Sequence, residues 1–155
     1  MRGQPRPVDP DVDLHVPAQR RELRHHHLSV LGAIALGGGL GALARHGLAL
    51  ALPTDPGGFP WHTLLTNVSG CLLIGVLMVL ITEVRTAHRL VRPFLGVGVL
   101  GGFTTFSTYA VEIRELLRPG TVTMAFGYLA GTLVAALLAV IAGMATTRAL
   151  AGVAR

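Results

Sequence analysis

Four long stretches of apolar residues limit what this chain can fold into. They run over residues 28–52, 61–82, 91–111 and 121–147. Each is long enough for the roughly 20 residues with which a helix crosses a bilayer. Only 14% of the 155 residues are charged, whereas a typical soluble domain has about 25%. We therefore predict an all-α membrane protein with four transmembrane helices.

The remaining segments offer little material for a second folded domain. Residues 1–27 hold four of the nine prolines and no apolar pattern that could build a core, so we predict a disordered tail there. The four-helix domain should then occupy residues 28–150, with loops at 53–60, 83–92 and 112–120. We see no phosphate loop, metal signature or serine–histidine–acid pattern, and we expect no enzyme.

The arginines predict how the chain lies in the membrane. All 13 basic residues are arginine. If the amino terminus is cytoplasmic, ten of them fall on that side and only Arg114 and Arg118 on the other. By the positive-inside rule, both termini should be cytoplasmic in a multi-pass protein of the cell inner (plasma) membrane. The arginines sit where lipid headgroups would meet them, so we expect membrane lipid and no nucleic acid as a partner.

Polar residues inside the apolar stretches are the candidates for function, because they are costly in lipid and usually face a pathway or a partner. The Asn67 amide offers two N–H donors at a depth where few other donors exist. Thr63 lies one turn earlier on the same helix face. Asn67 could serve a permeating anion, or it could bond to a neighbouring helix and hold the bundle together. Arg45 could likewise simply reach the membrane interface.

The third stretch contains the most unusual run of residues. Gly101 and Gly102 are followed by hydroxyl residues at 104, 105, 107 and 108, which make a poor continuous helix. A break between residues 101 and 107 would free backbone carbonyls, which persist at membrane depth only where they are buried or bind something. Alternatively, the glycines form a packing face and the hydroxyls bond back to their own helix. Spacing leaves both interpretations open.

The positions of the charged residues limit which kind of ion the protein could transport. No carboxylate lies in the middle of a stretch, which argues against a proton- or cation-coupled pump and favours an anion. A small proton-coupled multidrug exporter is the main alternative, but it needs a carboxylate in the first helix, where only Arg45 stands. A non-conducting membrane scaffold is another. The single cysteine, Cys71, excludes an internal disulfide and is interpreted as a packing residue.

Three segments resemble the Fluc (CrcB-type) fluoride channel family: GGGLGALARH at 37–46, TLLTNVSG at 63–70 and GGFTTFSTY at 101–109. The likeness extends over about residues 30–150 and includes all four helices in order. It implies a fluoride-specific channel that exports fluoride passively and relieves its toxicity. It also implies an antiparallel, dual-topology dimer with the third helix broken mid-membrane and two fluoride pathways at the subunit interface.

Site residues follow from the motif positions. The resemblance implies a structural sodium ion bound by the backbone carbonyls of Gly101 and Thr104. It implies that Asn67 is a pore donor, that Phe106 presents its ring edge to fluoride and that Arg45 lines a vestibule. The full set implied for the fluoride pathway is Asn67, Phe106, Tyr109, Thr63, Ser107, Thr108, Tyr128, Thr132 and Arg45. Such donors and ring edges suit fluoride, because a pore must replace its tightly held water.

Two positions depart from the family pattern, and one general feature raises a question about the partner. Tyr109 stands where the family has a second pore phenylalanine, and Ala136 stands where another hydroxyl is expected one turn beyond Thr132.

A subunit that inserts in both orientations should show little arginine bias, yet this one is strongly biased. We therefore hypothesise a heterodimer with an oppositely oriented homologous chain; a homodimer is the alternative.

Overall fold

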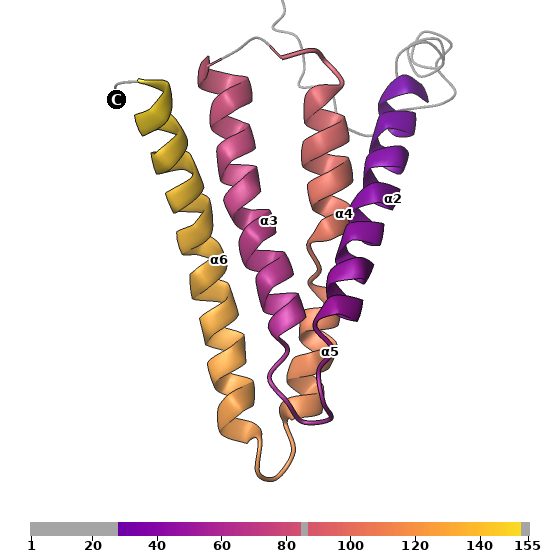
Figure 1. Ribbon diagram of the computed structural model, residues 1–155, viewed down its shortest axis with the longest axis vertical. Helices are drawn as coiled ribbons and strands as arrows, with labels where there is room; N and C mark the ends of the chain where they lie inside the picture. Colours follow the sequence, from indigo (N-terminus) through magenta and orange to yellow (C-terminus); the bar gives the residue numbers. More distant parts are fainter. Residues whose placement is uncertain (1–27, 85–86, 153–155) are drawn as a thin grey trace, which may run out of the picture.

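The structure is a computed structural model that describes residues 28–84 and 87–152. The first span is α2 (Leu28–Ala51), and the second is α3 (Trp61–Val79) continued by the π-helical η2 (Leu80–Val84). The third consists of the π-helical η3 (Arg92–Leu100), α4 (Gly101–Phe103) and α5 (Ser107–Leu116), and the fourth is α6 (Val122–Ala151) (Figure 1). All four described spans are long and apolar enough to cross a membrane, which confirms the predicted class. The predicted tail, residues 1–27, lies outside the described residues.

The spans begin within one residue of their predicted starts, but the third ends at Leu116 instead of 111 and the fourth at Ala151 instead of 147. We expected a loop from residue 112, and that prediction is wrong because α5 continues to Leu116. Charge at Glu112 and Glu115 had indicated a loop, whereas the Glu112 carboxylate is held inside the bundle by hydrogen bonds. The chain turns beyond Pro119, where Gly120 has a φ of 96°, a conformation that favours glycine.

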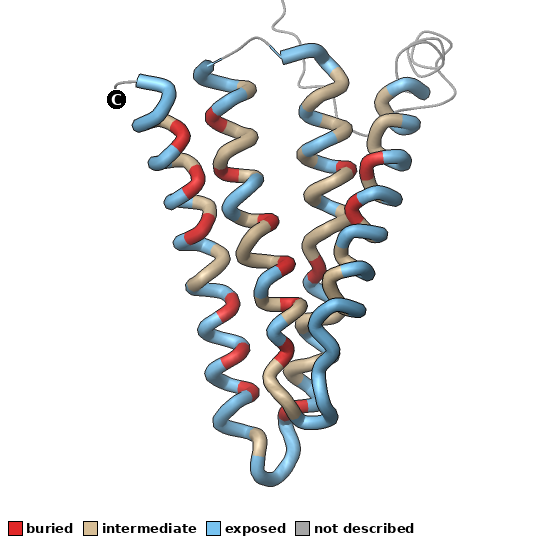
Figure 2. Tube along the Cα trace, in the orientation of Figure 1, coloured by how far each residue is buried: buried red, intermediate tan, exposed pale blue. Residues whose placement is uncertain are grey.

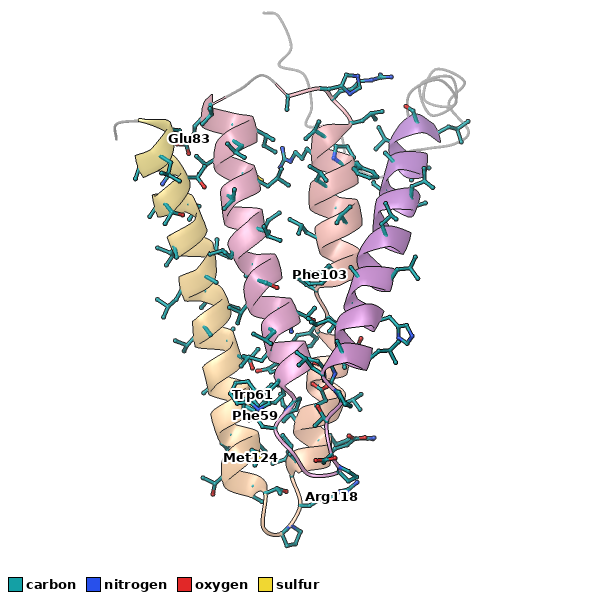
Figure 3. The ribbon with its side chains drawn as sticks, in the orientation of Figure 1. Phe59, Trp61, Glu83, Phe103, Arg118 and Met124 are labelled. Atoms are coloured by element: carbon teal, nitrogen blue, oxygen red, sulfur yellow. The ribbon has the colours of Figure 1, made fainter. Side chains whose placement is uncertain are left out.

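The second and fourth spans, α3 and α6, lie side by side and run in the same direction (Figure 1). A Cβ added at Gly75 would collide with the Val140 carbonyl, so only glycine allows this close backbone approach. Near the ends of these helices, Arg148 Nη2 lies 2.6 Å from Glu83 Oε1, and Figure 3 shows Glu83 at that end of the bundle. These contacts fix the register of the two helices.

The third span changes its neighbour partway along. Its first part, η3 and α4, packs on α2, whereas α5 packs on α6. Between them, residues 104–106 are not helical, and Thr104 is extended with φ −71° and ψ 156°. Figure 3 places Phe103, the residue before this interruption, about halfway along the bundle. The extended residue therefore lets the first part of this span pack on α2 and its last part pack on α6.

The buried interior of the bundle is unusually polar. Buried residues lie mainly along the facing sides of α3 and α6 (Figure 2), and they include Thr63, Thr66, Thr132 and the side chain of Tyr128. Many large apolar side chains are exposed instead, such as Leu36 at 70%. This inside-out distribution suits a chain whose outer surface meets lipid and whose interior holds polar groups.

Candidate functional site

The interruption of the third span is held by Asn67 of α3. Its Nδ2 donates to the Thr105 carbonyl at 2.9 Å, and its Oδ1 accepts from the Thr105 N–H at 2.8 Å. One side-chain amide therefore satisfies both polar groups of a residue that has left the helix. This is the bundle-holding role considered for Asn67, and it leaves the second Nδ2 hydrogen available for another acceptor.

Two carbonyls beside the interruption lose their helical donors. In a continuous helix the N–H of Thr105 would donate to Gly101, and that of Thr108 to Thr104. Here the Thr105 N–H donates to Asn67, and the Thr108 N–H donates to Thr105 Oγ1 at 3.2 Å. Gly101 and Thr104 are the two residues whose carbonyls the sequence predicted as sodium ligands. Arg45 Nη1 lies 3.4 Å from the Thr104 carbonyl oxygen.

A cavity of about 260 Å³ lies where the interruption faces α3 and α6. We call it the ring cavity, and its lining residues are Asn67, Cys71, Thr104, Thr105, Phe106, Tyr109, Thr132, Leu133 and Ala136. It brings together four of the predicted pathway residues, namely Asn67, Phe106, Tyr109 and Thr132. Of the buried side chains in the described part of the chain, only Thr66 Oγ1 and Thr132 Oγ1 have no hydrogen-bond partner. Thr132 is 4% exposed and lines the cavity, so its unpartnered hydroxyl is a candidate donor there.

A second cavity, of about 170 Å³, lies on the other side of Thr105. We call it the arginine cavity, and its lining residues are Ala42, Arg45, His46, Ala49, His62, Thr63, Thr66, Thr105 and Thr108. It contains three further predicted residues, Arg45, Thr63 and Thr108, and the other unpartnered hydroxyl, that of Thr66. A guanidinium and the unpartnered Thr66 hydroxyl make this cavity suited to an anion.

Glu112 connects helices α3 and α6 near the end of the bundle where both helices begin. Its Oε1 accepts from the Thr63 hydroxyl at 2.8 Å, and its Oε2 accepts from the Tyr128 hydroxyl at 2.7 Å. His62 Nε2 lies 3.3 Å from Oε1. A carboxylate in a membrane span needs such donors, because an unpaired charge there is costly. Thr63 and Tyr128, both predicted for the pathway, therefore have this carboxylate as their hydrogen-bond partner.

Aromatic rings form a row from the ring cavity towards the end of the bundle where α3 and α6 begin. The ring centroids of Phe106 and Tyr109 are 6.0 Å apart, those of Tyr109 and Tyr128 are 5.2 Å apart, and those of Tyr128 and Phe59 are 5.4 Å apart. Phe59 also contacts Trp61, and Figure 3 shows these two near that end. The Tyr109 hydroxyl donates to the Leu129 carbonyl at 2.5 Å. The hydroxyl that distinguishes Tyr109 from the family's phenylalanine is thus bonded to the backbone of α6.

Sequence reasoning missed Glu112, and it placed neither Thr66 nor Thr105 in the predicted pathway. Thr105, Thr108 and Glu112 are spaced three and four residues apart, which places polar groups on one helix face. That spacing could have indicated that Glu112 belongs to the helix. The prediction followed its charge instead and placed it in the loop from residue 112. Of the predicted residues, Ser107 is exposed and lines neither of these two cavities, although its Oγ lies 3.4 Å from Thr105 Oγ1.

Comparison with known proteins gives a consistent set of relatives. Residues 32–144 match the family described as CrcB-like protein, Camphor Resistance (CrcB). A protein of Nocardia farcinica named fluoride-specific ion channel FluC 2 is 58% identical over 127 residues, which are 82% of this chain and 91% of that protein. A FluC 2 of Streptomyces avermitilis is 55% identical over 125 residues, covering 81% and 79%. The fluoride-specific ion channel FluC of Paracoccus denitrificans is 43% identical over 117 residues, covering 76% and 93%.

The two tyrosine hydroxyls provide a matched test of the Glu112 network. Tyr128→Phe removes a hydrogen bond to a carboxylate and should destabilise the folded protein by about 1.5–3 kcal/mol. Tyr109→Phe removes only a bond to a backbone carbonyl and should cost about 0.5–1.5 kcal/mol. Thermal unfolding of the detergent-solubilised variants measures both changes. A larger loss of stability for Tyr109→Phe would contradict the central role of Glu112.

Proposed function

Because the chain belongs to the CrcB-like family, as the resemblance predicted, we propose that it is a fluoride-specific ion channel that exports fluoride passively across the cell membrane. Its relatives are named as ion channels and not as enzymes. The single observation that carries the proposal is the ring cavity, where an amide, a free hydroxyl and aromatic rings meet at the interrupted span. We propose that this interruption lies at mid-membrane depth.

The lining of the ring cavity suits a small, strongly hydrated anion. Fluoride must exchange its water for closely placed donors, and the second N–H of Asn67 and the Thr132 hydroxyl are such donors. Phe106 and Tyr109 offer the positive edges of their rings. Because the Tyr109 hydroxyl is bonded to Leu129, its ring can act as the family's phenylalanine does.

The arginine cavity would attract the anion before it reaches the rings. Arg45 carries the positive charge, and the Thr66 and Thr108 hydroxyls line the same space. Thr105 lines both cavities, so an ion passing between them would remain beside the Asn67–Thr105 contact. Thr63 and Tyr128 are proposed to act by donating hydrogen bonds that hold the Glu112 carboxylate in a fixed position.

One subunit leaves the ring cavity incomplete. Phe106 is 80% exposed, although its ring lines this cavity, so a second subunit is needed to enclose the ion. We propose an antiparallel dimer, because the family resemblance implies it, and we propose that the termini of this chain are cytoplasmic. The start of α2 and the end of α6 lie at the same end of the bundle (Figure 1), which supports placing both termini on one side.

We also propose a structural sodium ion at the dimer axis. The carbonyls of Gly101 and Thr104 have lost their helical donors, and oxygen ligands suit a hard cation. The Thr104 oxygen accepts a long hydrogen bond from Arg45 Nη1, which leaves its second lone pair for the ion. Two carbonyls are too few for one ion, but a two-fold axis would supply four. The positive charge would join the two subunits at their interrupted spans and favour anions nearby.

The Thr132 hydroxyl gives a direct test of the channel proposal. Thr132→Val removes a hydroxyl that has no partner within the described structure, so folding should be unaffected. If that hydroxyl serves the ion, fluoride efflux should fall roughly ten-fold or more, because a hydrogen bond to a charged group is worth about 1.5–3 kcal/mol. A fluoride electrode records efflux from sealed liposomes, with the partner chain added where flux requires it.

Thr147→Val is the matched control for this experiment. It makes the same change in the same helix, but the Thr147 hydroxyl bonds back to the Gly143 carbonyl at 2.7 Å and lies outside the ring cavity. Efflux should stay at the level of the unmodified protein. Equal efflux for both variants would remove Thr132 from the pathway, and liposomes that retain all their fluoride would overturn the channel proposal.

Sodium removal tests the proposed cation site. Purification in N-methylglucamine instead of sodium should reduce the dimer population seen by size-exclusion chromatography, and fluoride efflux should fall with it. Returning sodium should restore both, because the carbonyl oxygens would again share an ion. A dimer that is unchanged after exhaustive sodium removal would argue against the site.

Expressing the chain alone, with protease-sensitive tags at both termini, tests orientation and partner choice. The arginine bias predicts that every tag faces the cytoplasm and that efflux requires an oppositely oriented homologous chain. Tag cleavage from inside-out and right-side-out vesicles measures orientation. Tags on both sides together with full efflux would show a homodimer and exclude the required partner.

A further inference from the structure

We infer that the thiol of Cys71 is a pathway donor that replaces the hydroxyl missing at Ala136. This inference rests on the proposed channel function and deepens it. Its independent support comes from the register between α3 and α6 and from the walls of the ring cavity, which Cys71 and Ala136 both line.

The register of the two helices places side chains in matched levels. Because α3 and α6 run in the same direction, residues a fixed number apart remain neighbours along their whole length. Glu83 and Arg148, 65 residues apart, form an ion pair at one end, and Gly75 approaches Val140 at the same separation. At the other end, Glu112 joins Thr63 to Tyr128, which are again 65 residues apart.

The two levels next to the Thr63–Tyr128 level fall inside the ring cavity. Asn67 and Thr132 form one level, and Cys71 and Ala136 form the next, one helical turn further on. All four residues line the cavity. At the second level α6 contributes only a methyl group, so the Cys71 thiol is the polar group that this pair of residues offers.

The neighbouring level shows that the cavity has unused hydrogen-bonding capacity. Among the described residues, the Thr132 hydroxyl is buried and has no partner, although buried hydroxyls are normally bonded. A thiol is a weak donor, but fluoride is a strong acceptor. An ion leaving the Asn67–Thr132 level would therefore meet a further donor one turn away, on α3 instead of α6.

Substitution at Cys71 tests the donor role. Cys71→Ser keeps a small donor and should conduct at least as well as the unmodified protein. Cys71→Ala and Cys71→Val remove the donor and should lower fluoride efflux about three-fold to ten-fold, a smaller loss than for Thr132→Val because a thiol is a weaker donor than a hydroxyl. Efflux from Cys71→Ala equal to that of the unmodified protein would overturn the inference.

Chemical modification gives a second measurement that does not depend on how the variants fold. In the reaction with 2-aminoethyl methanethiosulfonate, the Cys71 thiol loses its proton to solvent and the thiolate attacks the sulfenyl sulfur. A new S–S bond forms as methanesulfinate leaves. The adduct should block efflux, and dithiothreitol should restore it. Because Cys71 is the only cysteine, no other thiol of this chain can react.

A cysteine on the opposite face is the control. Leu73 is 47% exposed and lies about 200° around the helix from Cys71. Leu73→Cys in the Cys71→Ser background should conduct with or without reagent, as should Cys71→Ser alone. No effect of the reagent on the unmodified protein would overturn the inference while leaving the channel proposal intact. Absence of efflux before any treatment would instead overturn the channel proposal itself.

Discussion

The pairing of Asn67 with the backbone of Thr105 is the interaction on which the polar interior depends. Where a membrane helix stops, its freed N–H and C=O groups must find partners inside the protein, because lipid offers none. A planar amide supplies a donor and an acceptor together, so one side chain satisfies both groups of Thr105. The same contact leaves the Gly101 carbonyl without its helical donor, and the Thr105 hydroxyl, which accepts from the Thr108 N–H, does the same for the Thr104 carbonyl.

The parallel register of α3 and α6 explains why the polar groups occur in levels one turn apart. Close backbone contact at Gly75 fixes the spacing, and the Glu83–Arg148 pair fixes the end of the register. The chemistry of each level is therefore the sum of two side chains from different helices. Considered along α6 alone, Ala136 interrupts the polar track; considered across the level, Cys71 continues it.

Hydropathy was sufficient to predict four spans and their starting residues, because apolar length directly reflects bilayer thickness. The polar candidates were also identifiable, since each stood out against lipid-facing neighbours. Their partners were not predictable, because periodicity gives the face of one helix but not its offset from another. Glu112 shows the result: its charge indicated a loop, whereas donors from two other spans keep it inside the helix.

The second subunit that we propose would complete what one chain leaves open. Phe106 presents its ring to a cavity that is open on one side, and 80% of the residue is exposed. Lipid could cover this ring, but lipid could not supply the oxygen ligands that the proposed sodium ion would need beside Gly101 and Thr104. A two-fold axis close to the interrupted spans would meet both needs at once, by closing the cavity and doubling the carbonyls. The interruption would then be the place where folding, assembly and ion passage are joined.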